Sequence, residues 1–311
     1  MPASDRFSGY LGTGLVAAIL AAGLFMVLQT VFGASVSTSV TVGNAAPSVT
    51  AITISPNPTI TLTANATTAV QVNATITDNN GCADITGGTT TVLLYRSGYS
   101  SSTCLSAGQD SLRCYVATAF TASSTCSTTS QNTTTTFGVQ YFAQATDASS
   151  SFSSQTWRAT VIFKDANNAT GTADDGTSPN VATLTAIQPT SSINYGTLAA
   201  GQDTGSTNQV ATTSNAGNSS TTLQLRATQT LTSGSNTIAT SSQVYSTSTF
   251  TYAGTSTALT DSLVTVGGFF LTAPTSQTLV SQGTFWGLSV PGGTATGTYS
   301  GTNEFSALFQ P

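Results

Sequence analysis

The chain has 311 residues, of which only 5% are charged, and it contains no histidine. Its six basic residues are scattered, so the sequence lacks the cationic cluster that binding a nucleic-acid backbone requires. The lack of histidine excludes histidine-based triads, histidine metal sites and imidazole acid–base catalysis. No GxSxG motif occurs, and most acidic residues are expected in solvated loops rather than in a catalytic pair. We therefore predict a non-enzymatic protein that does not bind nucleic acid.

Residues 10–32, YLGTGLVAAILAAGLFMVLQTVF, form an uncharged apolar segment. As a helix it would measure about 34 Å, against about 30 Å for the hydrocarbon core of a bilayer. Arg6 is the only basic residue beside it, and the next is Arg96, which predicts an N-terminus inside the cell and the bulk of the chain outside. We expect residues 10–32 to contact a membrane, and we assign residues 1–34 to a signal-anchor or transmembrane helix.

The fate of this helix has three alternatives. Its length favours a retained anchor that spans the membrane once. The small residues Gly33, Ala34 and Ser35 also suit cleavage as a signal peptide, which would release a secreted protein. A pilin-like N-terminus fits less well, because the chain's single glutamate is Glu304 and none lies near a glycine cleavage site.

The rest of the chain predicts an all-β fold with two tandem Ig-like β-sandwich domains. Residues 35–47 have the composition of an extended linker that ends at a proline. In residues 48–165, apolar and polar residues alternate, most clearly at 70–77 and 157–163, as they do in half-buried strands. About seven strands separated by turn residues indicate a sandwich. Residues 166–180 lack large apolar side chains and are predicted to be a linker, and residues 181–311 are predicted to form the second sandwich.

All four cysteines lie in the first predicted sandwich. They are Cys82, Cys104, Cys114 and Cys126, at spacings of 22, 10 and 12 residues. An even number of cysteines behind an export segment predicts two disulfides in an oxidising compartment, whereas a four-thiolate metal site would need closer pairs. Three pairings are possible. An assumed strand order favours Cys104–Cys114 and Cys82–Cys126, because each pair would then lie at one end of the sandwich.

Several segments resemble those of known surface proteins. TITDNNGCAD (75–84) and LLYRSG (93–98), followed by a cysteine-flanked loop, resemble Ig-like or fibronectin-III-like cell-surface proteins of poorly characterised, candidate-phylum bacteria or archaea. SINYGTLAAGQ (192–202) and WGLSVPGGTATGTYSGTNEF (286–305) resemble the C-terminal β-sandwich of similar envelope proteins. The resemblance covers most of residues 48–311. It implies a surface-exposed Ig-like architecture and no particular ligand or chemistry.

A calcium ion is the one cofactor for which the sequence offers a candidate site. Asp78, Asn80 and Asp84 place side-chain oxygens at alternate positions around Gly81, as calcium ligands often are. The loop departs from EF-hand spacing and lacks a bidentate glutamate, so the alternative is a turn whose Asp and Asn side chains cap their own backbone. Further oxygen-bearing residues would join the site if they lay at the same end of the sandwich: Asp165, Asn167, Asp174 and Asp175.

Candidate glycosylation sites occur as N-x-S/T sequons at Asn65, Asn73, Asn132, Asn168 and Asn218. Asn73 falls on the polar phase of its predicted strand and should face solvent, as an acceptor must. Chance also produces sequons easily in a chain this rich in Asn and Thr.

Taken together, these features predict an extracellular cell-envelope protein with a structural or adhesive role, anchored or exported by its N-terminal helix. The alternatives are a pilin-like filament subunit and a secreted glycan-binding module. The expected partners are the membrane and either further copies of the chain or other surface proteins and glycans.

Overall fold

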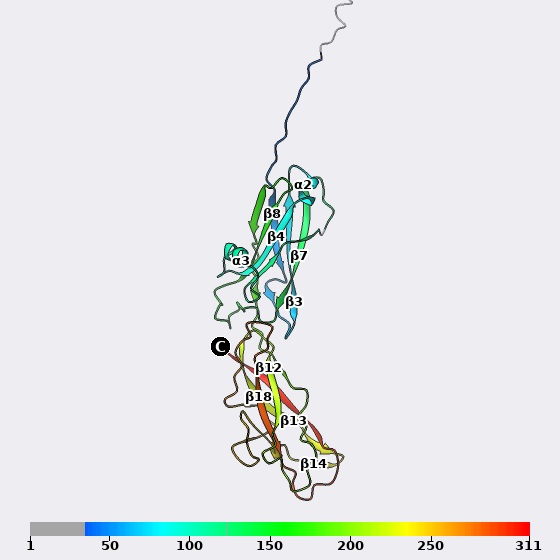
Figure 1. Ribbon diagram of the computed structural model, residues 1–311, viewed down its shortest axis with the longest axis vertical. Coiled ribbons are helices and arrows are strands. Elements are labelled where there is room, and N and C mark those ends of the chain that lie inside the picture. The colour runs from blue at the N-terminus through cyan, green and yellow to red at the C-terminus, as the bar shows by residue number, and fades with distance from the viewer. Residues whose placement is uncertain (1–34, 123) are drawn as a thin grey trace, which may run out of the picture. The chain divides into compact units, whose positions relative to one another are not determined.

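The computed structural model describes residues 35–122 and 124–311. The predicted membrane segment at 10–32 lies outside these residues. Within the described ranges, no helix is both long enough and apolar enough to cross a membrane. Residues 35–47 have no regular secondary structure, and Val36, Val40 and Val42 in this segment are more than 80% exposed. Asn44–Pro311 form one compact unit whose regular secondary structure is almost entirely β-strand (Figure 1).

The N-terminal half of this unit, residues 44–181, contains two antiparallel sheets with four strands each. The first sheet has the order β1 (Ser48–Ser55), β3 (Thr67–Thr77), β7 (Ser130–Gln140) and β6 (Thr121–Ala122). The second has the order β5 (Cys114–Ala117), β4 (Thr89–Arg96), β8 (Trp157–Lys164) and β9 (Thr170–Asp174). Two short helices lie in the connections, α2 (Cys82–Thr86) after β3 and α3 (Ser101–Ala107) after β4.

The alternating pattern of the sequence explains how these sheets bury one core. In β3, every second residue from Val70 to Ile76 is at most 5% exposed, whereas the residues between them are half-buried or exposed. Val161 and Phe163 of β8 pack into the same cluster from the other sheet. Because side chains alternate between the two faces of a strand, this period of two gives each sheet one apolar face. The two faces meet in a core centred on these strands.

The C-terminal half, residues 182–311, also has two sheets, and it buries a main core together with a smaller apolar cluster. One sheet has the order β11 (Ile187–Pro189), β12 (Gln209–Asn215), β18 (Ser281–Leu288), β15 (Gln243–Ser246) and β16 (Thr257–Ala258). The other is built on β13 (Ser220–Ser233), which pairs with β14 (Asn236–Ile238), β17 (Val264–Thr265) and β19 (Ser300–Gln310). The 3₁₀ turn η1 (Thr240–Ser242) precedes β15. Trp286 of β18 is fully buried in this core.

Residues 166–180, predicted to be a linker, instead contain β9. This strand pairs with β8 from Lys164↔Thr170 to Thr160↔Asp174 and so completes the second sheet. The chain enters β1 directly against this strand: a Cβ added at Gly171 would clash with the Pro47 carbonyl oxygen. Just beyond it, β10 (Asn180–Val181) pairs in parallel with β2 (Thr59–Ile60). Small side chains therefore mark a close backbone approach here rather than a free connection.

Candidate metal centre

Three acidic residues meet where several connections of the N-terminal half come together. Asp78 directly follows β3, Asp165 directly follows β8, and Asp84 belongs to α2. Strand β1 begins at the same end, since Ser48 pairs with Thr77. The label of α2 marks this end of the sheets in Figure 1. Strands of opposite sheets and the helix α2 thus bring three carboxylates to one place, although Asp78 and Asp165 are far apart in the sequence.

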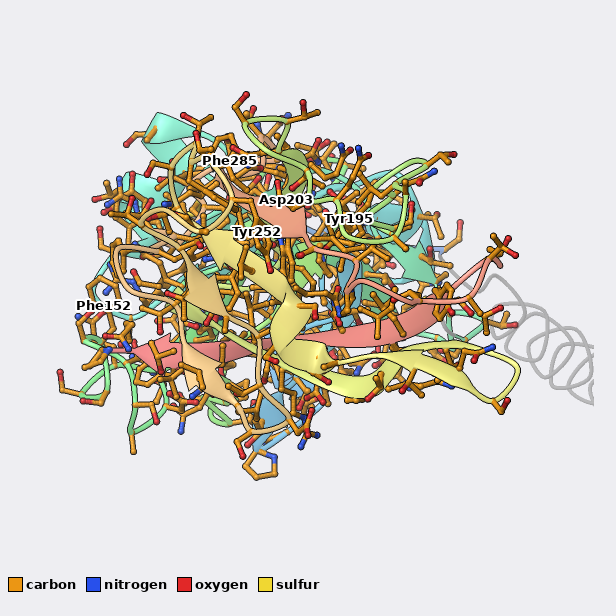
Figure 2. All side chains as sticks on the ribbon, turned by 90° about the horizontal axis from the view of Figure 1, so that it is seen from below. Phe152, Tyr195, Asp203, Tyr252 and Phe285 are labelled. Carbon is orange, nitrogen blue, oxygen red and sulfur yellow. A yellow bond between two sulfur atoms is a disulfide. The ribbon has the colours of Figure 1, made fainter. Side chains whose placement is uncertain are left out.

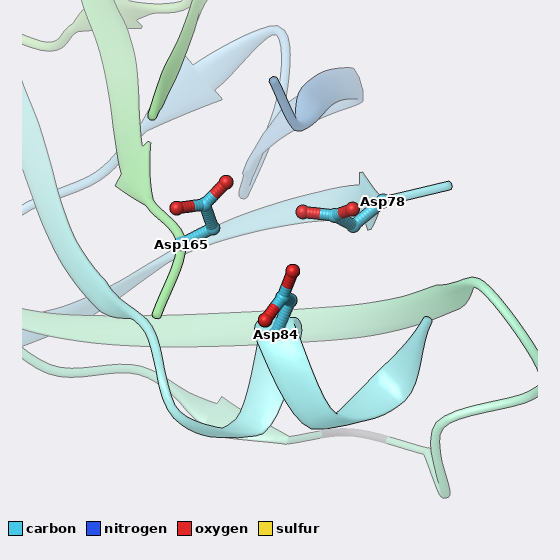
Figure 3. A group of neighbouring side chains, drawn as sticks. All are labelled: Asp78, Asp84 and Asp165. Carbon is cyan, nitrogen blue, oxygen red and sulfur yellow. The ribbon is translucent and has the colours of Figure 1, made fainter. Parts of the chain in front are cut away.

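The three carboxylates are close together and face a common space. One oxygen from each of Asp78, Asp84 and Asp165 lies within 4.8 Å of the other two (Figure 3). Asp78 and Asp165 are buried, with 1% and 4% of their surface exposed, and Asp84 is half-buried. Like charges at such distances repel one another strongly, and more so away from water. The cluster therefore needs a source of compensating positive charge.

Asp78 has one satisfied and one unsatisfied oxygen. Its Oδ1 accepts a hydrogen bond from the backbone amide of Asn80 at 2.8 Å. Its Oδ2 is shielded from solvent and has no hydrogen-bond partner. A buried carboxylate oxygen without a partner carries the full cost of its lost hydration. The Asp78 carboxylate points toward Asp84 and Asp165, so the unsatisfied oxygen belongs to a group of neighbouring carboxylates (Figure 3).

Asp165 is held by a dense set of donors. Its Oδ1 accepts the backbone amides of Asn167 at 2.9 Å and Ala169 at 2.8 Å, and its Oδ2 accepts Nδ2 of Asn44 at 2.9 Å. Burial acts to raise the pKa of Asp165, but these hydrogen bonds outweigh it, so the pKa lies below its ordinary value. Asp165 is therefore held as a carboxylate, and its position is fixed by the loop that follows β8.

Asp84 is positioned by a neutral side chain. Nδ2 of Asn167 lies 2.9 Å and 3.0 Å from the two carboxylate oxygens of Asp84, and 3.3 Å from Oδ1 of Asn44. No basic side chain takes part: within the described residues the ion pairs are Arg113–Asp110 and Arg226–Glu304. The donors around the three carboxylates are all neutral amides, which leave the negative charge uncompensated.

The sequence predicts Asn80 as a calcium ligand with Asp78 and Asp84. Its Oδ1 accepts the backbone amide of Ala45 at 2.6 Å. The third carboxylate beside Asp78 and Asp84 comes from Asp165. Asp174 and Asp175, the other predicted candidates, are not in the cluster. Asp174 pairs with Thr160, which lies five residues before Asp165. At the rise of a β-strand, this places Asp174 about 16 Å along the sheet from Asp165. The oxygen of Asn80 instead ties the first residues of the compact unit to the loop after β3.

Both disulfides have the pairing that the sequence favoured. Cys82–Cys126 joins the start of α2 to the segment before β7, with 5.9 Å between the Cα atoms. Cys104–Cys114 joins α3 to β5, with 5.6 Å between the Cα atoms. The first disulfide lies two residues from Asp84, so it fixes the helix that carries one of the three carboxylates.

The predicted sequons differ in how accessible their amide nitrogens are. Asn132 and Asn168 are exposed, whereas Asn73 is half-buried and its Oδ1 accepts the Thr134 hydroxyl. Nδ2 of Asn65 donates to Gln188. Nδ2 of Asn218 donates to the carbonyl oxygens of Ala143 and Ala182, at 2.9 Å and 3.1 Å. A glycan on Asn218 would displace these bonds, so Asn132 and Asn168 are the better candidates in the folded protein.

The C-terminal half contains a cavity of about 1020 Å³. Its apolar lining includes Tyr299 and Val290, and its polar lining includes Gln243 and Asn303. The Tyr195 hydroxyl donates to Oε1 of Gln243 at 3.2 Å. Burial raises the pKa of this tyrosine, which is labelled in Figure 2. Nδ2 of Asn303 donates to the same oxygen at 3.0 Å. The cavity thus combines aromatic surface with amide groups, as small-molecule sites commonly do.

No family model matches the chain, and no curated protein matches it. Among solved structures, the native conformation of E. coli alpha-2-macroglobulin is similar over 82% of this chain, with 10% sequence identity and a TM-score of 0.24. The chain spans 16% of the length of that protein.

Proposed function

We propose that the chain is a non-enzymatic extracellular protein of the cell envelope, with a structural or adhesive role. The observation that carries this proposal is the pair of disulfides, one joining α2 to the segment before β7 and the other joining α3 to β5. Disulfides persist in oxidising compartments outside the cytosol. An apolar segment at 10–32 would deliver the β-structure to such a compartment.

The strand order supports an Ig-like identity for the N-terminal half. The sheets β1-β3-β7-β6 and β5-β4-β8-β9 correspond to the order A-B-E-D in one sheet and C-F-G, with one further strand beside C, in the other. The three carboxylates then lie in the B–C and F–G connections, which Ig-like domains commonly use for binding. We propose the same sandwich architecture for the C-terminal half, and hence two tandem domains.

The position of the mature N-terminus tests how the protein is attached. We expect mass spectrometry of protein taken from its native compartment to find a start near residue 1, as a retained membrane anchor requires. A start near residue 10 would support a pilin-like filament subunit, and a start near residue 35 would support a secreted protein. Four free thiols in the native protein would contradict export in all three forms.

A secreted glycan-binding module is the second candidate, and the cavity in the C-terminal half favours it. Aromatic faces and amide groups match the apolar and hydroxyl surfaces of sugars, and Tyr299 and Asn303 supply both. If this function is correct, the full chain should bind on a glycan array, and Tyr299→Ala should weaken that binding at least about tenfold. Phe270→Ala is the control, because this side chain is 51% exposed and does not line the cavity. Non-binding across diverse glycans would count against this candidate.

A further inference from the structure

We propose that Asp78, Asp84 and Asp165 bind a calcium ion that fastens the first residues of the compact unit to its N-terminal half. This goes beyond the envelope function proposed above, which does not depend on it. Two independent observations point to the ion. One carboxylate oxygen from each residue lies within 4.8 Å of the other two, and Oδ2 of the buried Asp78 has no hydrogen-bond partner. A cation in this space would give that oxygen a partner and offset most of the negative charge of the three carboxylates.

The existing contacts cannot supply this compensation. Within the described residues, the hydrogen-bond donors to the three carboxylates are neutral amides, from Asn44, Asn167 or the backbone. These donors orient the carboxylates, as outer-shell groups do around metal ligands, but they bring no positive charge to the cluster. Asn44 and Asn167 also touch each other through Nδ2 of Asn167 and Oδ1 of Asn44. The amide groups therefore surround the cluster and contact one another. The space between the three carboxylates remains available to an ion.

The donor set selects calcium among common metal ions. All three ligand groups are carboxylates, and no histidine exists in the chain, so zinc and copper would lack their preferred ligands. Calcium takes six to eight oxygen ligands in flexible geometry, so three carboxylates and several waters suffice. Asp84 is half-buried and leaves one side accessible to those waters. Magnesium demands a stricter octahedral arrangement and dehydrates reluctantly.

The location of the site gives the ion a mechanical role. Asn44 donates to Asp165, and the Ala45 amide donates to Asn80 in the loop between Asp78 and Asp84. Calcium would therefore tie together residues 44–45, the β3–α2 loop and the β8–β9 loop. Extracellular modules with few ligands typically bind calcium with a dissociation constant on the order of 10⁻⁴–10⁻³ M. Such a site would be filled outside the cell and empty in the cytosol.

Calorimetric titration of the full chain in detergent micelles, after removal of metal with a chelator, tests the site. We expect CaCl₂ to bind with one site per chain and a dissociation constant in the range above, and MgCl₂ to bind at least about tenfold more weakly. Asp78→Asn should weaken calcium binding at least about tenfold. The matched control is Asp174→Asn, which removes the same charge about 16 Å along the sheet from Asp165 and should leave the affinity unchanged.

Hydrogen exchange provides a second readout and a check on folding. Calcium should slow exchange in a peptide containing Ala45 at least about threefold in the wild type, and not in Asp78→Asn. Loss of the near-UV circular dichroism signal in Asp78→Asn would show that this variant does not fold. Asp84→Asn then replaces it, because this half-buried side chain can be changed with less disturbance. Absence of calcium binding, equal loss in Asp174→Asn, or unchanged exchange at residues 44–47 would overturn the proposal.

Discussion

Replacing Trp157 with alanine should lower the free energy of unfolding by roughly 3–5 kcal/mol, because it leaves a large cavity in the N-terminal core. The indole is fully buried between the two sheets, and its ring centroid lies 6.0 Å from that of Tyr115. Its Nε1 donates to the Gln144 carbonyl oxygen at 3.0 Å. The substitution therefore removes both packing and the partner of a carbonyl group.

Two further variants separate these contributions. Trp157→Phe keeps most of the apolar volume but leaves the Gln144 carbonyl without its donor, so we expect a smaller loss of about 1–3 kcal/mol. Phe270→Ala serves as the control, since this side chain is 51% exposed and its removal should change stability by less than about 0.5 kcal/mol. Urea unfolding of the full chain in micelles, followed by circular dichroism, measures all three.

The Trp157→Ala variant also tests the predicted division into two domains. The chain has two tryptophans, so Trp157→Ala leaves Trp286 as the only indole fluorophore. Trp286 lies in the C-terminal core, which shares no buried residue with the N-terminal core. If the halves unfold separately, the Trp286 transition should keep its midpoint while the circular dichroism transition begins earlier. A common shift of both transitions would show one cooperative unit and contradict the two-domain prediction.

The strands with a strong period of two could be predicted from the sequence, whereas the edge strand β9 could not. Residues 70–77 and 157–163 alternate because each strand has one face in the core, and the structure places β3 and β8 there. Strand β9 has the sequence TGTAD, without a large apolar residue, because it lies at an edge and close to Pro47. Helices α2 and α3 have five and seven residues, too short to show a helical period.

The candidate site was only partly predictable for a related reason. Asp78 and Asp84 are close in the sequence, and their spacing around Gly81 indicates a loop rich in oxygen ligands. Asp165 has a comparable local signal, an Asp-x-Asn sequence directly after a strand. Only the strand order brings the ends of β3 and β8 together. Local patterns therefore identify the oxygen-bearing loops, and the topology decides which of them share a site.

Replacing both Cys82 and Cys126 with serine should cost about 4 kcal/mol of stability, because the disulfide closes a loop with a sequence separation of 44. The Cys104–Cys114 disulfide closes a loop with a separation of only 10, so its removal should cost less, about 3 kcal/mol. Urea unfolding of the two double variants, as full chains in micelles, compares these losses. Equal losses would contradict the dependence on loop length.

The two disulfides should differ more sharply in their effect on calcium. Cys82 begins α2, and Asp84 lies two residues further on, so cutting Cys82–Cys126 frees the helix that carries one ligand. The double serine variant should therefore bind calcium at least about tenfold more weakly, as loss of a supporting group commonly does. The variant without Cys104–Cys114 should keep its affinity, because α3 and β5 supply no ligand. If the calcium affinity falls equally in both variants, general loosening of the fold, rather than the position of α2, controls the site.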